Sequence, residues 1–120
     1  MIERELGSFA RWSIGEIVRD YRLAHPVCQY TGCVAATQDI HHNVPMATII
    51  ESGIALLSTE DLTEAEKIYS KASLDFQPFS LPFDHKFTRY IAERHKENIL
   101  MAVCRDHHYK IEGKVKRSVA

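Results

Sequence analysis

The chain lacks any run of about 18 uninterrupted apolar residues, so it contains no segment that could span a membrane. Its first residues, Met1 to Leu6, have neither the basic start nor the apolar stretch of a secretory signal. We therefore expect a cytoplasmic, reducing environment and no membrane partner.

The chain also lacks an excess of charge of either sign. Its 15 lysines and arginines and 16 aspartates and glutamates leave a formal net charge of -1. This balance argues against a protein that coats nucleic acid by charge alone, so any contact with DNA needs a local basic patch. The segment after Cys104 is locally basic, and it is either a solvated face or a phosphate-contacting helix and tail. Its basic residues are Arg105, Lys110, Lys114, Lys116 and Arg117.

Cysteine is scarce, with 3 residues in 120, and three cysteines cannot all pair within one chain. In a reducing compartment such residues serve as metal ligands or core more often than as disulfides. A chain of this length fits one small domain that buries roughly 65% of its unfolded surface. A core this thin is often supplemented by a structural metal, and one histidine added to three thiolates completes a zinc ligand set.

Apolar residues at helical spacing predict four helices, over residues 9–23, 46–57, 61–72 and 86–96. Ser8, Ser58 and Asp84 are the expected N-caps, and His25-Pro26 ends the first helix. The first helix is expected to pack on the core, although its arginines could also contact phosphate. Residues 76–83 contain two prolines among aromatics and predict an irregular connector.

Two histidine pairs are the centre of the sequence. Cys28 and Cys33 bracket a short loop in which Gly32 allows a tight turn, and residues 34–40 are expected to form a strand that ends at His41-His42. Pro45 closes that element. Far downstream, Asn98 precedes a Cys-x2-His-His motif. The motif consists of Cys104, His107 and His108.

This order and spacing resemble the HNH endonuclease family, also described as the ββα-metal nuclease fold. The resemblance covers about a third of the chain, over residues 28–45 and 97–111. It implies an α+β fold in a single domain, residues 1–120, with a ββα-metal core formed by residues 28–45 and 97–112. An N-terminal helix and a helical insert, residues 46–96, are additional to that core.

The resemblance implies two metal sites and a general base. A structural zinc would be bound by Cys28, Cys33, Cys104 and His107. A catalytic divalent cation (Mg²⁺, Mn²⁺, Ni²⁺ or Zn²⁺) would be bound by His41 and His108. His42 would take a proton from the attacking water, because imidazole titrates near neutrality, and Asn98 would orient this base or brace its loop.

The implied activity is metal-dependent hydrolysis of DNA phosphodiester bonds, giving a 5′-phosphate and a 3′-hydroxyl. Arg105 and Lys110 could clamp the phosphate. The implied partners are DNA and either a protein that supplies specificity or a second copy of the chain. Members of this family often occur in phages and mobile elements, in which case the location would be the host cytoplasm.

Three alternatives stay open. Adjacent residues of a regular strand point to opposite faces, so Asp39 and His41 could hold the metal while His42 packs. Either His107 or His108 could turn towards the zinc. Finally, the chain could be a zinc-stapled nucleic-acid or protein binding module whose nuclease centre is unused.

Overall fold

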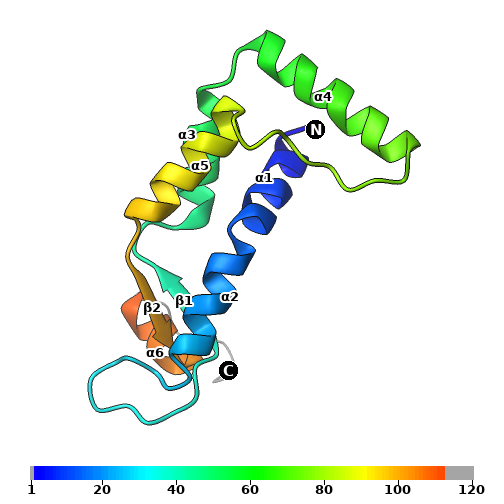
Figure 1. Ribbon diagram of the computed structural model, residues 1–120. Coiled ribbons are helices and arrows are strands. Elements are labelled where there is room, and N and C mark those ends of the chain that lie inside the picture. The colour runs from blue at the N-terminus through cyan, green and yellow to red at the C-terminus, as the bar shows by residue number, and fades with distance from the viewer. Residues whose placement is uncertain (1, 113–120) are drawn as a thin grey trace, which may run out of the picture. The chain divides into compact units, whose positions relative to one another are not determined.

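The computed structural model describes residues 2–112, which form six helices and two strands (Figure 1). In chain order these are α1 (Ile2–Ser13), α2 (Gly15–Ala24), β1 (Asp39–His42), α3 (Met46–Ala55), α4 (Thr59–Leu74), α5 (Lys86–Glu97), β2 (Leu100–Val103) and α6 (Arg105–Ile111). The chain is thus a small α+β protein. Among residues 2–112, no helix combines the length and apolar character needed to cross a membrane.

The described chain divides into two compact units. Residues 2–15 and 44–98 form the first, which we call the helical unit, and it includes the segment that the sequence indicates as an insert. Residues 16–43 and 99–112 form the second, which we call the strand unit, and it includes both histidine pairs and all three cysteines.

The helical unit packs α1, α3 and α5 against one another, with α4 against α1. The expected helix over residues 9–23 is wrong in its start and its continuity. Ile2, Leu6, Phe9 and Ala10 form a buried stripe at helical spacing, so α1 begins at Ile2. The helical path is then interrupted at the buried residue Ile14.

Much of the expected apolar face of that helix is exposed. Trp12, Ile17 and Leu23 have exposed fractions of 72%, 54% and 72%, and α2 has no buried residue. The second half of that segment, α2, instead contacts the rest of the strand unit through a polar group. The Tyr21 hydroxyl lies 2.7 Å from Gln29 Oε1 and 3.0 Å from the Leu100 carbonyl oxygen, and both oxygens can accept a hydrogen bond from it.

The other three predicted helices are confirmed as α3, α4 and α5. Ser58 caps α4 as expected: its hydroxyl accepts a hydrogen bond from the Asp61 amide, and the Asp61 carboxylate accepts one from the Ser58 amide. The expected cap Asp84 is wrong. His85 caps α5 instead, its Nδ1 accepting from the Phe87 amide at 3.1 Å.

Gly53 lies in the middle of α3, where glycine weakens a helix. A Cβ atom at this position would lie 3.1 Å from the Phe87 ring and 3.2 Å from the Tyr90 ring. The glycine therefore lets α3 approach α5 closely.

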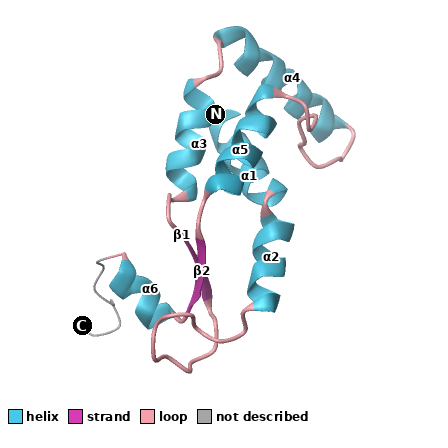
Figure 2. Cartoon of the chain, turned by 60° about the vertical axis from the view of Figure 1, so that its left-hand side comes forward, coloured by secondary structure: helices cyan, strands magenta, loops and turns pink. Residues whose placement is uncertain are grey.

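In the strand unit, β1 and β2 form a two-stranded antiparallel sheet with His41 opposite Met101 and His42 opposite Leu100 (Figure 2). The expected strand over residues 34–40 is wrong, because β1 begins only at Asp39. The segment after Cys33 folds back: the Cys28 amide donates to the Ala35 carbonyl, and Val27 bridges Ala36. This turn closes the cysteine loop, so the segment cannot extend β1.

Candidate metal-binding site

Four potential metal ligands converge in the strand unit. Cys28 and Cys33 come from the loop before β1, Cys104 is the N-cap residue of α6, and His107 lies in the first turn of α6. Gly32, with φ +82°, provides the left-handed turn that places the second thiol. The four ligand atoms all lie within 4.8 Å of one another.

The spacing of these atoms fits a tetrahedral zinc ion. Zinc bonds of about 2.3 Å to sulfur and 2.0–2.1 Å to nitrogen place neighbouring ligands roughly 3.6–3.8 Å apart. His107 Nδ1 lies 3.6 Å from Cys28 Sγ and 3.3 Å from Cys104 Sγ, and the Cys33 and Cys104 sulfurs are 4.0 Å apart. The cluster can therefore hold a metal ion, and its ligands are consistent with structural zinc.

The backbone around the cluster favours thiolates. Burial raises the pKa of Cys28, but hydrogen bonds from the Cys104 and Tyr30 backbones and from His107 outweigh it and lower the pKa to about 7. At Cys33 a hydrogen bond from the Ala35 backbone lowers the pKa, yet desolvation and the neighbouring thiols raise it above its usual value. In both cases the backbone two residues after the cysteine donates to the sulfur, which favours the thiolate.

Tyr30 holds the histidine of this cluster in place. Its ring stacks on the His107 imidazole with centroids 4.1 Å apart and an angle of 5° between the planes. Lys110 lies over the Tyr30 ring at 5.3 Å. His107, and not His108, is therefore the histidine that faces the thiols.

One histidine from each pair contributes to a separate cluster. His41, His108 and Glu112 place ligand atoms within 4.8 Å of one another, and the His41 and His108 rings meet edge to face at 5.4 Å. His108 Nε2 lies 3.5 Å from a Glu112 carboxylate oxygen, while its Nδ1 lies 3.4 Å from Asp39 Oδ2. His41 Nδ1 is buried and has no hydrogen-bond partner among residues 2–112.

His42 is not part of this cluster. β1 ends at His42, but both histidines are paired in register with β2, so the pleat directs them to opposite faces of the ribbon. Ile40, which is 8% exposed, shares a face with His42. His42 Nε2 is a buried atom.

Asn98, the C-cap residue of α5, makes a two-point contact with the segment after the histidine pair. Its Oδ1 accepts from the Val44 amide and its Nδ2 donates to the Val44 carbonyl oxygen, both at 2.9 Å. The side chain thus fixes Val44, two residues after His42.

The two basic residues predicted to contact phosphate lie on α6. Arg105 is exposed, and its Nε lies 3.7 Å from Asp39 Oδ2. Lys110 contacts the Tyr30 ring. The basic residues Lys114, Lys116 and Arg117 lie outside the described residues.

Glu112 is the site residue that sequence reasoning missed. It follows His108 by four positions, a spacing that places two side chains on the same face of a helix. This periodicity is present in the sequence, but a single carboxylate within a basic segment is a weak signal for a metal ligand. Asp39, an alternative metal ligand, instead lies against His108 and Arg105.

Comparisons with known proteins return no match: no family model, no curated protein and no solved structure is significantly similar to this chain.

Proposed function

We propose that this chain is a metal-dependent DNA endonuclease that hydrolyses phosphodiester bonds at a one-metal site of the HNH type. The observation that carries the proposal is the convergence of His41 on β1 with His108 on α6, beside a separate cluster of three cysteines and one histidine. A protein stabilised by zinc alone needs only the cysteine cluster. The second cluster, with two imidazoles and a carboxylate, has the ligand types of a catalytic divalent cation.

In the proposed site, His41, His108 and Glu112 would hold the cation. Asp39 would act as a positioning residue, because its carboxylate faces Nδ1 of His108 while Glu112 faces Nε2. Carboxylates that engage one histidine nitrogen fix the tautomer and orientation of a ligand that binds through the other. A bound divalent cation would stabilise charge on the scissile phosphate and on the departing 3′ oxygen.

His42 would accept the proton of the attacking water, in line with the family resemblance. Asn98 would hold the end of the histidine segment in place through Val44. Arg105, exposed on α6, would attract the DNA phosphate.

A plasmid-cleavage assay tests this proposal. The protein is treated with EDTA, supplied with Mg²⁺, Mn²⁺, Ni²⁺ or Zn²⁺, and assayed alongside a zinc determination. We expect cation-dependent cutting that falls at least a hundredfold in His41→Ala and His42→Ala, while about one zinc per chain is retained. His25→Ala, which alters a histidine outside both clusters, serves as the matched control and should cut normally.

A binding module stapled by zinc is the second candidate, and the strand pleat favours it. Because His41 and His42 lie on opposite faces, a base and a metal ligand from these two positions do not share a side of the ribbon. If none of the cations restores cutting to a correctly folded, zinc-loaded protein, the endonuclease is ruled out and this candidate stands. If His42→Ala cuts normally while His41→Ala does not, His42 is a packing residue and another group is the base.

A further inference from the structure

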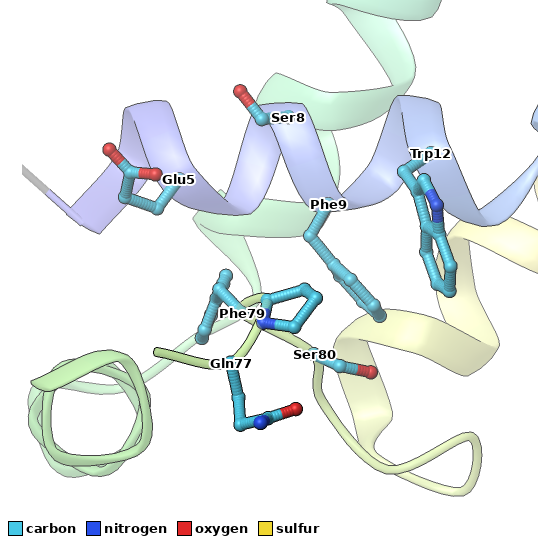
Figure 3. Close-up of a pocket in the computed structure, with 8 residues that line it drawn as sticks. Glu5, Ser8, Phe9, Trp12, Gln77, Phe79 and Ser80 are labelled. Atoms are coloured by element: carbon cyan, nitrogen blue, oxygen red, sulfur yellow. The ribbon is translucent and has the colours of Figure 1, made fainter. Parts of the chain in front are cut away.

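A pocket in the helical unit is lined by aromatic rings and one carboxylate (Figure 3). It has a volume of about 500 Å³ and lies between α1 and the connector that follows α4. Figure 3 shows Phe9 and Trp12 reaching from α1 towards this connector. Pro78 and Phe79 form its opposite wall.

The rings of the pocket are held by one another. The centroid of the Phe9 ring lies 6.3 Å from that of Trp12, in a stacked arrangement. It lies 5.9 Å from the centroid of the Phe79 ring, which it meets edge to face. The Tyr69 ring on α4 meets the Phe79 ring edge to face, with the ring centroids 5.6 Å apart. Trp12 is nonetheless 72% exposed, so a large aromatic face stays open to a ligand.

Glu5 lines the same pocket, seven residues before Trp12 on α1. It is half-buried and forms no ion pair with any residue between positions 2 and 112. At a rise of about 1.5 Å per residue, Glu5 and Trp12 are roughly 10 Å apart along the helix. One extended arginine with its backbone can bridge this separation.

We infer that the pocket binds an arginine side chain presented by a partner protein segment. The guanidinium would pair with the Glu5 carboxylate, and the aliphatic stem would lie against Trp12 and Phe79. Arginine fits better than lysine, because its planar group stacks on aromatic faces and matches a carboxylate with two parallel hydrogen bonds. Gln77, at the pocket wall, offers an amide to the backbone of such a segment.

Charge argues for this ligand over a nucleic-acid base. Stacking on Trp12 would also suit a base, but Glu5 would repel the phosphates attached to it. Arg4 and Arg11 are exposed on α1, about 100° or more around the helix from Glu5, and neither lines the pocket. The single charged group in the pocket is thus an acid.

Trp12 is the sole tryptophan of the chain, so its fluorescence reports on this pocket alone. We would titrate the full-length protein with the capped peptide acetyl-Ala-Arg-Ala-amide, and with the same peptide containing citrulline, the neutral isostere of arginine. We expect a saturable fluorescence change with the arginine peptide and at least tenfold weaker binding of the citrulline peptide.

Glu5→Gln should weaken binding of the arginine peptide at least tenfold, whereas Glu51→Gln, the same change at an exposed site on α3, should leave it unaltered. Circular dichroism verifies that each variant is folded. Equal binding of both peptides, an equal loss in both variants, or no saturable change would overturn the inference. A change produced by oligo-dT and not by the peptide would assign the pocket to single-stranded DNA and also overturn it.

The inference does not depend on the proposed endonuclease. Glu5 lies in the helical unit and the histidine clusters lie in the strand unit. We therefore expect Glu5→Gln to cut plasmid at the normal rate, so the two proposals can fail separately.

Discussion

The two units of this chain are stabilised by different means. In the helical unit, side chains from α1 and α5 are fully enclosed, with Leu6, Phe87 and Ile91 at most 1% exposed. In the strand unit, the buried cluster consists of Val103 and two cysteines, Cys28 and Cys104. The first unit has an apolar core, whereas the buried cluster of the second includes residues that could hold a metal ion.

This difference follows from the length of the elements. A two-stranded ribbon of four-residue strands is marginal in water by itself, and α6 is only seven residues long. Burial of a Phe or Leu side chain contributes about 1.5–3 kcal/mol, and the strand unit encloses few such side chains. A metal ion held by the cysteine cluster would supply stability that its short elements do not.

Removal of a metal ligand should have the largest effect, and it should affect one unit. Cys104→Ala deletes a thiolate from a site whose metal is typically worth about 10–16 kcal/mol of apparent binding energy. We expect zinc to be lost and amide protection to disappear over residues 16–43 and 99–112, while the helical unit stays protected in hydrogen exchange. Val34→Ala, beside Cys33 and 91% exposed, is the control. If residues 16–43 and 99–112 kept their amide protection after the metal was lost, the strand unit would not depend on the metal for its stability.

Truncation of the apolar core should destabilise the helical unit and leave the zinc content of the strand unit unchanged. Phe87 is 1% exposed, and Phe87→Ala should lower the free energy of unfolding of the helical unit by about 3–5 kcal/mol through lost burial and a cavity. Denaturant unfolding measures this loss, and a zinc determination should still find about one ion per chain. Phe83→Ala, at a phenylalanine that is 88% exposed, should change neither quantity. Loss of zinc in Phe87→Ala would show that the two units are not stabilised separately.

The smallest effect should come from the cap of α4, and it depends on pH. The Lys86 ammonium and the Ser58 amide and hydroxyl lower the pKa of Asp61 to about 2. Because the folded-state pKa lies below the usual value, Asp61 stabilises the fold above about pH 4, and this contribution is lost as the pH falls towards 2. Asp61→Asn should therefore lower Tm at pH 7, and the difference from the native protein should shrink on acidification. Glu60→Gln, at an exposed carboxylate in the same helical turn, is the control.

Much of the helical unit could be predicted because periodicity and caps are local signals. The Ser58 capping box and the proline-containing connector each depend on residues close in sequence. The division of the first helix was missed, because Ile2 and Leu6 are buried by helices far along the chain and Ile14 faces inward where the helix breaks.

In the strand unit, the ligands of the cysteine cluster were predictable and the path of the backbone was not. Thiols and imidazoles at suitable spacing indicate a metal whatever the chain does between them. The position of β1 depends on the Cys28 amide reaching the Ala35 carbonyl, a bond set by closure of the loop. The choice of His107 over His108 depends on stacking against Tyr30, which the sequence does not reveal.

The contact between Asn98 and Val44 also bears on how the chain assembles. In topological terms, all of residues 44–98 is the loop of a β-hairpin, since β1 ends just before it and β2 begins just after it. Closing a disordered loop of roughly 55 residues would cost about 3.5 kcal/mol in chain entropy. Residues 44–98 fold within one unit, and the Asn98 side chain joins their two ends through Val44. Once this unit has folded, most of the entropy cost of closing the loop has already been met, before β1 pairs with β2. Folding of the helical unit would therefore raise the zinc affinity of Cys28, Cys33 and Cys104 through chain connectivity alone.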